Sequence, residues 1–188
     1  MHAPDMDRFV ALFRGINVGK ARRIAMADLR GLLVSLGFSN VTTLLNSGNA
    51  VFDGPSASPA KHAQRIKAAV ANDLGVDAPV MVKSAGDIAA IVAFNPLLSI
   101  AIDPSRLLVA LGRDADALRA FVPIVDKDAG PDEFHVGANA IFVWCANGIL
   151  ESTVAATLLK GLGESITTRN WSTIQKIHAA MNSGNGVP

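Results

Sequence analysis

Residues 41–52 read Val-Thr-Thr-Leu-Leu-Asn-Ser-Gly-Asn-Ala-Val-Phe and indicate a β-hairpin. Two short apolar runs, 41–45 and 50–52, flank the stretch Asn46-Ser47-Gly48-Asn49. Asn and Gly tolerate the positive φ angles that tight hairpin turns require, so this stretch predicts the turn. The hairpin predicts an antiparallel sheet, and the segments on either side of it indicate which kind.

Those segments alternate between strand and helix patterns. Apolar spacing places helices before and after the hairpin, and Ser58 with Pro59 is a typical helix start. The predicted elements are a strand at 9–13, a helix at 26–36, the hairpin, a helix from 58 to 74, a strand at 79–83 and a helix from 84. The order β-α-β-β-α-β across residues 8–95 is that of a ferredoxin-like split β-α-β sheet, an α+β fold.

The second half of the chain repeats this order without repeating the residues. Its predicted elements are a strand at 107–111, a helix capped by Asp114 that bears Leu118, Phe121 and Val122, a hairpin of strands 134–136 and 140–145, a helix from 152 to 162, a strand at 166–168 and a helix from Trp171 to Met181. The sequence therefore predicts a duplicated fold: one sub-domain at 8–95, a second at 104–182, and a flexible tail at 183–188.

Composition excludes several classes of function. Lys and Arg number 17 against 16 Asp and Glu, so the global basic field of a nucleic-acid coat is absent. The one cysteine, Cys145, lies in an apolar strand pattern and is expected to be an inert core thiol. The four histidines lack metal-ligand spacing, so no metal or cofactor is expected. No apolar run reaches the roughly 18 residues of a membrane span, and no signal-peptide pattern is present. We expect a cytoplasmic protein.

The stretch Arg14-Gly15-Ile16-Asn17-Val18-Gly19-Lys20 carries the most chemical information. Two glycines and a lysine after a strand suggest a phosphate loop, but a P-loop needs four residues between its glycines and a hydroxyl after the lysine. Here three residues intervene, and Ala21 replaces the hydroxyl. What is left is a glycine turn with the four cations Arg14, Lys20, Arg22 and Arg23. Such a turn suits an anion, or is a tight turn with a solvated basic rim.

A second polar stretch is Thr167-Thr168-Arg169-Asn170-Trp171, before the last predicted helix. Thr168 or Asn170 is suited to cap that helix, with Trp171 on its buried face. Alternatively Arg169 binds an anion and Trp171 stacks on a base. No arrangement of nucleophile, acid or base that supports catalysis is evident.

These stretches resemble an uncharacterised bacterial family, the domain of unknown function numbered 1697. The family's Arg-Gly-Ile-Asn-Val-Gly turn is matched by residues 14–19, its Met-x-x-Leu helix start by 26–29, its Ser-Gly-Asn hairpin by 47–49, and its Thr-x-Arg-Asn-Trp segment by 167–171. The resemblance runs from about Arg8 to Met181. It implies a bacterial cytosolic protein with a ferredoxin-like α+β fold, and it implies no activity.

The predicted topology has a geometric consequence. In a split β-α-β sheet the strands lie in the order 4-1-3-2, so the turn after the first strand and the first hairpin share one end of the sheet. Gly15 and Gly48 are therefore expected at the same rim. We hypothesise that Arg14, Asn17, Asn46, Ser47 and Asn49 converge there, either to serve a ligand or to hold the two turns together by hydrogen bonds.

The leading interpretation is a binding module for a phosphate-bearing small molecule at the 14–19 turn and the 46–49 hairpin. The candidate ligand-binding residues are Arg14, Asn17, Lys20, Asn46, Ser47, Asn49, Arg169 and Asn170. Nucleic acid is less favoured, because aromatic residues make up 5% of the chain and Tyr is absent. One alternative is an enzyme that uses Arg14 or Arg169 for electrostatic stabilisation and water as its nucleophile. Another is an interaction protein whose apolar content forms a homodimer face. No membrane partner is expected.

Overall fold

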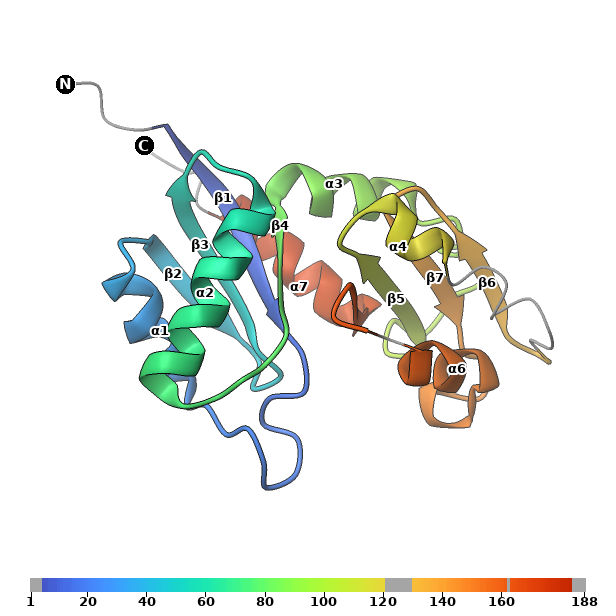
Figure 1. The fold of residues 1–188 in the computed structure, drawn as a ribbon. Helices are drawn as coiled ribbons and strands as arrows, with labels where there is room; N and C mark the ends of the chain where they lie inside the picture. Colours follow the sequence, from blue (N-terminus) through green and yellow to red (C-terminus); the bar gives the residue numbers. More distant parts are fainter. Residues whose placement is uncertain (1–4, 121–129, 162, 184–188) are drawn as a thin grey trace. The chain divides into compact units, whose positions relative to one another are not determined.

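The computed structural model describes residues 5–120, 130–161 and 163–183, and the chain alternates strands and helices through them (Figure 1). The elements are β1 Met6–Phe13, α1 Met26–Ser35, β2 Ser39–Leu44, β3 Asn49–Pro55, α2 Pro59–Leu74, β4 Val80–Ser84, α3 Ala85–Phe94, β5 Leu107–Gly112, α4 Ala115–Arg119, β6 Glu133–Val136, β7 Ala140–Trp144, η1 Ile149–Glu151, α6 Thr153–Gly161, β8 Ile166–Asn170 and α7 Trp171–Asn182. Beyond Ser183 the predicted tail lies outside the described residues, as do Phe121 and Val122 of the helix predicted after Asp114.

The strands form two four-stranded antiparallel sheets of the same topology. Their orders are β2-β3-β1-β4 and β6-β7-β5-β8, so in each sheet the first and third strands of the repeat lie at the centre. This is the 4-1-3-2 order of a split β-α-β sheet. The predicted α+β, ferredoxin-like, duplicated fold is confirmed.

By its internal contacts the chain divides into two compact units. The first unit comprises Met1–Gly86 together with Lys176–Pro188, and the second comprises Asp87–Gln175. Nearly all of α3, which follows the last strand of the first sheet, thus belongs to the second unit. The end of α7, which follows the last strand of the second sheet, belongs to the first. The predicted boundaries 8–95 and 104–182 follow the repeat of element order along the sequence and not the contacts. They remain a prediction of where each repeat begins and ends.

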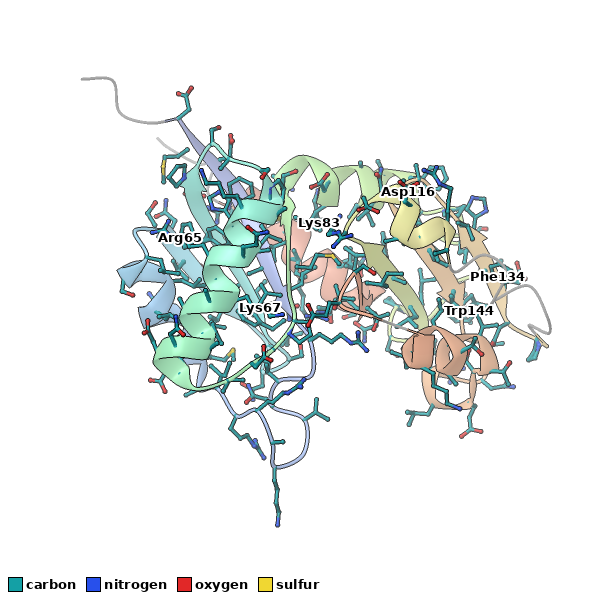
Figure 2. All side chains as sticks on the ribbon, in the orientation of Figure 1. Arg65, Lys67, Lys83, Asp116, Phe134 and Trp144 are labelled. Atoms are coloured by element: carbon teal, nitrogen blue, oxygen red, sulfur yellow. The ribbon has the colours of Figure 1, made fainter. Side chains whose placement is uncertain are left out.

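One face of the first sheet packs an aromatic cluster against α1 and α2. Phe52 lies with its ring centroid 5.8 Å from that of Phe9 and 4.4 Å from that of Phe38. The buried His62 of α2 joins these rings, and its Nε2 lies 3.0 Å from the carbonyl oxygen of Pro55. Arg65, labelled on α2 in Figure 2, covers the outer side of the Phe38 ring with its guanidinium carbon 5.3 Å from the centroid. These rings are the aromatic part of a larger apolar core that also includes Leu29, Leu33 and Ile66.

The other face of β1 is also buried, at Val10 and Leu12. Arg8 lies on that same face, because side chains alternate along a strand. Its Nη2 donates to the carbonyl oxygen of Ala180, 3.0 Å away, in α7. The end of α7 therefore lies against the face of the first sheet that α1 and α2 leave uncovered.

The second sheet packs Leu108, Ile141 and Val143 against Val154 and Leu158 of α6. Cys145 is fully buried in this core, and burial raises the pKa of its thiol. The buried thiol has little thiolate character, as expected of a core cysteine.

The predicted helix starts are confirmed in both units. Ser58 accepts a hydrogen bond from the backbone N–H of Lys61 at the start of α2, and Pro59 is the first residue of that helix. Asp114 accepts one from the backbone N–H of Ala117, 2.9 Å away, at the start of α4. Each side chain occupies a donor that the helix itself leaves without a partner.

Candidate functional site

The end of β1 and the β2–β3 hairpin meet at one end of the first sheet (Figure 1). The backbone N–H of Phe13 donates to the carbonyl oxygen of Gly48 at 2.8 Å. A Cβ on Gly48 would lie 2.5 Å from Cδ1 of Ile16 and 2.8 Å from Cβ of Phe13, and the φ angle of Gly48 is +86°. Only glycine fits this position. The predicted placement of Gly15 and Gly48 at the same rim is thus confirmed.

The hairpin turn differs in detail from the sequence prediction. Its strands end at Leu44 and begin at Asn49, and the positive φ angles fall on Leu45 (60°) and Gly48 (86°). The predicted turn is present, and within 46–49 it is Gly48 and neither Asn that takes the positive angle. Asn49 is instead fully buried in the strand, and its Nδ2 donates to the carbonyl oxygen of Leu44 at 2.9 Å and to Oγ of Ser47 at 3.1 Å. Asn49 thus ties the two sides of the hairpin together.

Asn17 closes the loop between β1 and α1. Its Oδ1 accepts from the backbone N–H of Ile24, and its Nδ2 donates to the Ile24 carbonyl oxygen, both at 2.9 Å. The same Nδ2 donates to the carbonyl oxygen of Asn46 in the hairpin, also at 2.9 Å. The backbone N–H of Asn17 donates to the carbonyl oxygen of Arg22 at 3.1 Å. One side chain therefore fixes both ends of residues 17–24 and attaches them to the hairpin.

The closed loop presents positive charge. Lys20, Arg22 and Arg23 are exposed, and within the residues that the structure describes no ion pair or side-chain hydrogen bond engages them. No Asp or Glu lies between Asp7 and Asp28 in the sequence. Arg14 is half-buried at the base of the loop, and its backbone N–H donates to the carbonyl oxygen of Pro79 at 3.0 Å. The loop is a cationic surface on a rigid base.

A pocket of about 270 Å³ opens beside this loop, and we call it the α1 pocket. It is lined by Asn17, Arg23, Ile24, Ala25, Met26 and Asn46. Ala25 occupies the N-cap position of α1 and offers no side-chain hydrogen bond to the helix. The first N–H groups of α1 therefore lack a side-chain cap where the helix begins beside the pocket. The positive end of the helix dipole is at this same end of α1.

The sequence interpretation named Asn17 and Asn46 but did not include Ala25 and Met26. The available clue was Ala25 at a helix start, where Ser, Thr, Asp or Asn is the usual residue. Of the predicted residues, the structure joins Asn17 to Asn46 and Asn49 to Ser47 by hydrogen bonds, two pairs that meet in the same hairpin turn.

Arg169 and Asn170 lie in the second unit, at the end of β8. Nη1 of Arg169 lies 2.7 Å from the carbonyl oxygen of Thr168 and 3.2 Å from Oγ1 of Thr167. Burial lowers the pKa of its guanidinium to about 10, so the group keeps its proton at neutral pH.

Asn170 caps α7, because its Oδ1 accepts from the backbone N–H of Thr173 at 2.9 Å and from the Thr173 hydroxyl at 2.8 Å. Trp171 begins the buried face of this helix. The capping interpretation of this segment is confirmed, with Asn170 rather than Thr168 as the cap.

No group of three or more His, Cys, Asp or Glu side chains in the described part of the chain is arranged to hold a metal ion. No helix among the described residues has the length and apolar character needed to cross a bilayer.

The sheets and the glycine turn define a duplicated α+β protein of the kind that the sequence motifs indicated. The chain belongs to the family described as protein of unknown function (DUF1697), whose sequence model matches residues 6–142. It is similar to the solved structure of the conserved bacterial protein SP0830 from Streptococcus pneumoniae, at 25% identity and a TM-score of 0.78. That match covers 94% of this chain and 99% of the other, so it includes the second unit beyond the family match. Comparison with curated proteins found no match.

Proposed function

We propose that the first unit binds a phosphate-bearing small molecule at the α1 pocket. The observation that carries this proposal is the combination of an uncapped helix start with three exposed cations that have no partner in the described chain, Lys20, Arg22 and Arg23. A helix N-terminus supplies N–H donors and partial positive charge to an anion, and a guanidinium supplies two parallel donors.

Each residue of the loop has a distinct part in this proposal. Arg23 lines the pocket and would pair with the phosphate oxygens, while Lys20 adds charge at the rim. The exposed side chains of Asn46 and Ser47 offer further donors from the hairpin. Asn17 and Asn49 are already engaged with the backbone, so we assign them to positioning.

Arg14 anchors the base of the loop and is also assigned to positioning. Arg169 and Asn170 of the second unit have hydrogen-bond partners that fit a structural role, and the proposal does not require them.

The size of the pocket limits the ligand. A volume of about 270 Å³ is slightly below the roughly 300–1,000 Å³ of sites that enclose a drug-sized ligand. The pocket therefore suits a phosphoryl group whose organic part extends outward, such as a sugar phosphate or a nucleotide. Base stacking is not expected, because the aromatic rings of this unit lie in its core.

The test is a thermal-shift and calorimetric screen with phosphate, pyrophosphate, sugar phosphates and nucleotides. A ligand at one hundred times its dissociation constant should stabilise the wild type by about 2.7 kcal/mol. Arg23→Gln should weaken binding by about 10- to 100-fold, the range for one charged hydrogen-bonded contact. Asp28→Asn should tighten binding, because Asp28 is the one carboxylate in the first turn of α1.

Lys61→Gln is the matched control, because Lys61 is an exposed cation of the same unit on α2. It should leave binding unchanged. A screen in which no phosphate compound stabilises the wild type, or in which Arg23→Gln and the wild type respond equally, would contradict the proposal.

A second candidate function, self-association, is favoured by one observation in the second unit. Three large apolar side chains within residues 94–102 are exposed: Phe94 at 52%, Leu98 at 55% and Ile102 at 88%. Exposed apolar patches mark interaction sites in many proteins. Light scattering at increasing concentration tests for a homodimer, and Ile102→Ser should lower its mass toward that of the monomer. A monomeric mass for the wild type at every concentration would exclude this candidate.

A further inference from the structure

A larger cavity, of about 670 Å³, lies in the first unit at the edge strand β2. We call it the β2-edge cavity. Helix α1 contributes Arg30 and Val34, strand β2 contributes Asn40, Val41 and Thr42, and the remaining wall comes from Arg8 and the last turn of α7. It shares no lining residue with the α1 pocket. Its volume is within the range of small-molecule sites.

A β-bulge shapes this cavity. The pairing of β2 with β3 shifts register between Ser39 and Thr42, and Asn40 within that shift has a φ angle of 48°. A bulge bends an edge strand and re-aims its side chains. Nδ2 of Asn40 consequently reaches Oδ2 of Asp53 on β3, 2.7 Å away.

The same carboxylate is also bound by Arg8, whose Nη1 donates to Oδ1 of Asp53 at 2.8 Å. Both oxygens of Asp53 are therefore occupied by donors of the cavity wall. The Arg8 and Asp53 side chains are 14% and 20% exposed, so this pair is largely withdrawn from water. Asp53 neutralises Arg8 and leaves the second cation of the wall, Arg30, without an opposite charge.

Arg30 is exposed, and it has no hydrogen bond or ion pair within the described residues. Beside it lie the apolar side chains of Val34 and Val41 and the hydroxyl of Thr42. The wall thus combines one uncompensated guanidinium, polar donors and a short apolar surface. This combination suits a ligand with one negative charge and a small hydrocarbon part.

We propose that the β2-edge cavity binds a small organic carboxylate. The planar guanidinium of Arg30 matches a carboxylate in two parallel hydrogen bonds, and Thr42 supplies a further donor. The alkyl part of the ligand packs on Val34 and Val41. The net charge of the three ionised groups in and behind the wall, Arg8, Arg30 and Asp53, is one positive charge, which a monocarboxylate balances and a phosphate dianion exceeds. This proposal is independent of the phosphate site.

The probe is the series acetate, propionate and butyrate, followed through the backbone amide NMR signals of the full chain. The amides of Arg30 and of residues 40–42 should shift with ligand concentration, with dissociation constants of about 1 mM, the range for ligands of about five non-hydrogen atoms. Each added methylene should tighten binding by up to about fourfold, through burial against the valines.

Two exposed variants separate the contributions of charge and apolar surface. Arg30→Gln should abolish the shifts for all three carboxylates, whereas Val34→Ser should keep acetate binding and reduce the gain per methylene. Both side chains are exposed, so neither change threatens folding. Lys61→Gln is the control for the loss of one surface cation and should bind as the wild type does.

The outcomes also distinguish this site from the phosphate site. Arg23→Gln should leave the carboxylate series unaffected, and Arg30→Gln should leave phosphate binding unaffected. The proposal is overturned if the carboxylates shift no amide of residues 40–42 at any soluble concentration. It is also overturned if Arg30→Gln binds as well as the wild type, or if inorganic phosphate displaces butyrate at a lower concentration than butyrate itself requires.

Discussion

The two units share one sheet topology and differ where the first strand of each sheet ends. In the first unit, residues 14–25 separate β1 from α1 and form a closed, basic loop. In the second unit, residues 113–114 alone separate β5 from α4, and Asp114 caps the helix at once. The same scaffold thus supports an elaborated rim in one copy and a minimal turn in the other. The long loop accordingly carries the proposed phosphate site, and the two-residue turn of the second unit has no counterpart to it.

The hairpins at the two rims differ in a related way. Gly48 of the first hairpin lies against Phe13, the last residue of β1, and against Ile16 in the loop that follows. Gly137 of the second hairpin lies against the ring of Phe94, 2.8 Å from its ideal Cβ, and that side chain is 52% exposed. Gly48 combines its contacts with a left-handed backbone, whereas Gly137 has no positive φ angle and its ideal Cβ lies 3.1 Å from the carbonyl oxygen of Ala140.

The largest expected effect on stability comes from adding a methyl group at Gly48, with Gly137 as the comparison. Gly48→Ala should lower the free energy of unfolding by about 3 kcal/mol, because it combines a left-handed backbone with overpacking in the core. Gly137→Ala should cost less, about 1–2 kcal/mol, because it overpacks the Phe94 ring and the Ala140 carbonyl oxygen but requires no left-handed backbone. Urea denaturation of both variants measures the difference, and equal losses would mean that the two rims are packed alike.

A smaller effect is expected from removing the side chain that closes the basic loop. Asn17→Ala should cost about 2 kcal/mol through three lost hydrogen bonds and the positive φ angle of 56°. It should also make the chain much easier for trypsin to cut after Arg22 and Arg23.

Asn17→Gly is the matched control for this change, because glycine accepts the backbone angle and loses only the hydrogen bonds. It should be cut nearly as fast as Asn17→Ala while losing less stability. If neither variant is cut faster than the wild type, Asn17 does not hold the loop.

The next effect concerns the polar segment before α7. Asn170→Ala should lower stability by about 1 kcal/mol through loss of the helix cap, and Asn170→Asp should retain most of it. Thermal denaturation of the two variants and the wild type measures these differences in stability. If Asn170→Ala leaves stability unchanged but abolishes binding of a ligand, the segment is a site and not a cap.

The smallest expected effect is the response of the Asp114 cap to a change of pH. A hydrogen bond from the backbone of Ala117 holds the pKa of Asp114 below its ordinary value of 3.8. A depressed carboxyl pKa contributes stability above the ordinary value, and that contribution is lost as the pH falls through the lowered one. The loop of the first unit is closed by the amide of Asn17, which does not titrate.

On lowering the pH from about 5 to about 2, the amide NMR signal of Ala117 should therefore shift while that of Ile24 stays in place. Asp114→Asn should remove the shift at Ala117. A titration of the Ile24 amide in step with that of Ala117 would show that the two rims respond to acid in the same way.

Much of this comparison could be predicted from sequence, because it depends on local patterns. The order of elements along the chain followed from periodicity, and the caps Ser58 and Asp114 from residue type. The shared rim followed from the strand order of the antiparallel split β-α-β sheet. These features need only neighbouring residues and one rule of topology.

The rest depends on contacts that no local pattern encodes. The left-handed angle falls on Leu45, directly after the end of β2, although Asn tolerates this conformation better and Asn46 is the next residue. The pairing of Arg8 with Asp53 and Ala180 joins segments far apart in the sequence. The β2-edge cavity depends on that pairing, so the sequence analysis did not find it.

The division of α3 and α7 between the units has a consequence for synthesis in the cell. The strands of the first sheet are translated before the second unit, but Lys176–Asn182, which belong to the same unit as those strands, are translated after it. Until then Arg8 cannot donate its hydrogen bond to the carbonyl oxygen of Ala180, and one face of β1 is not covered by the end of α7. In many proteins an N-terminal domain folds before the next domain is made. The first unit of this chain cannot complete its fold in that order, because part of it follows the second unit in the sequence. Its first unit becomes complete only after the second unit has been translated.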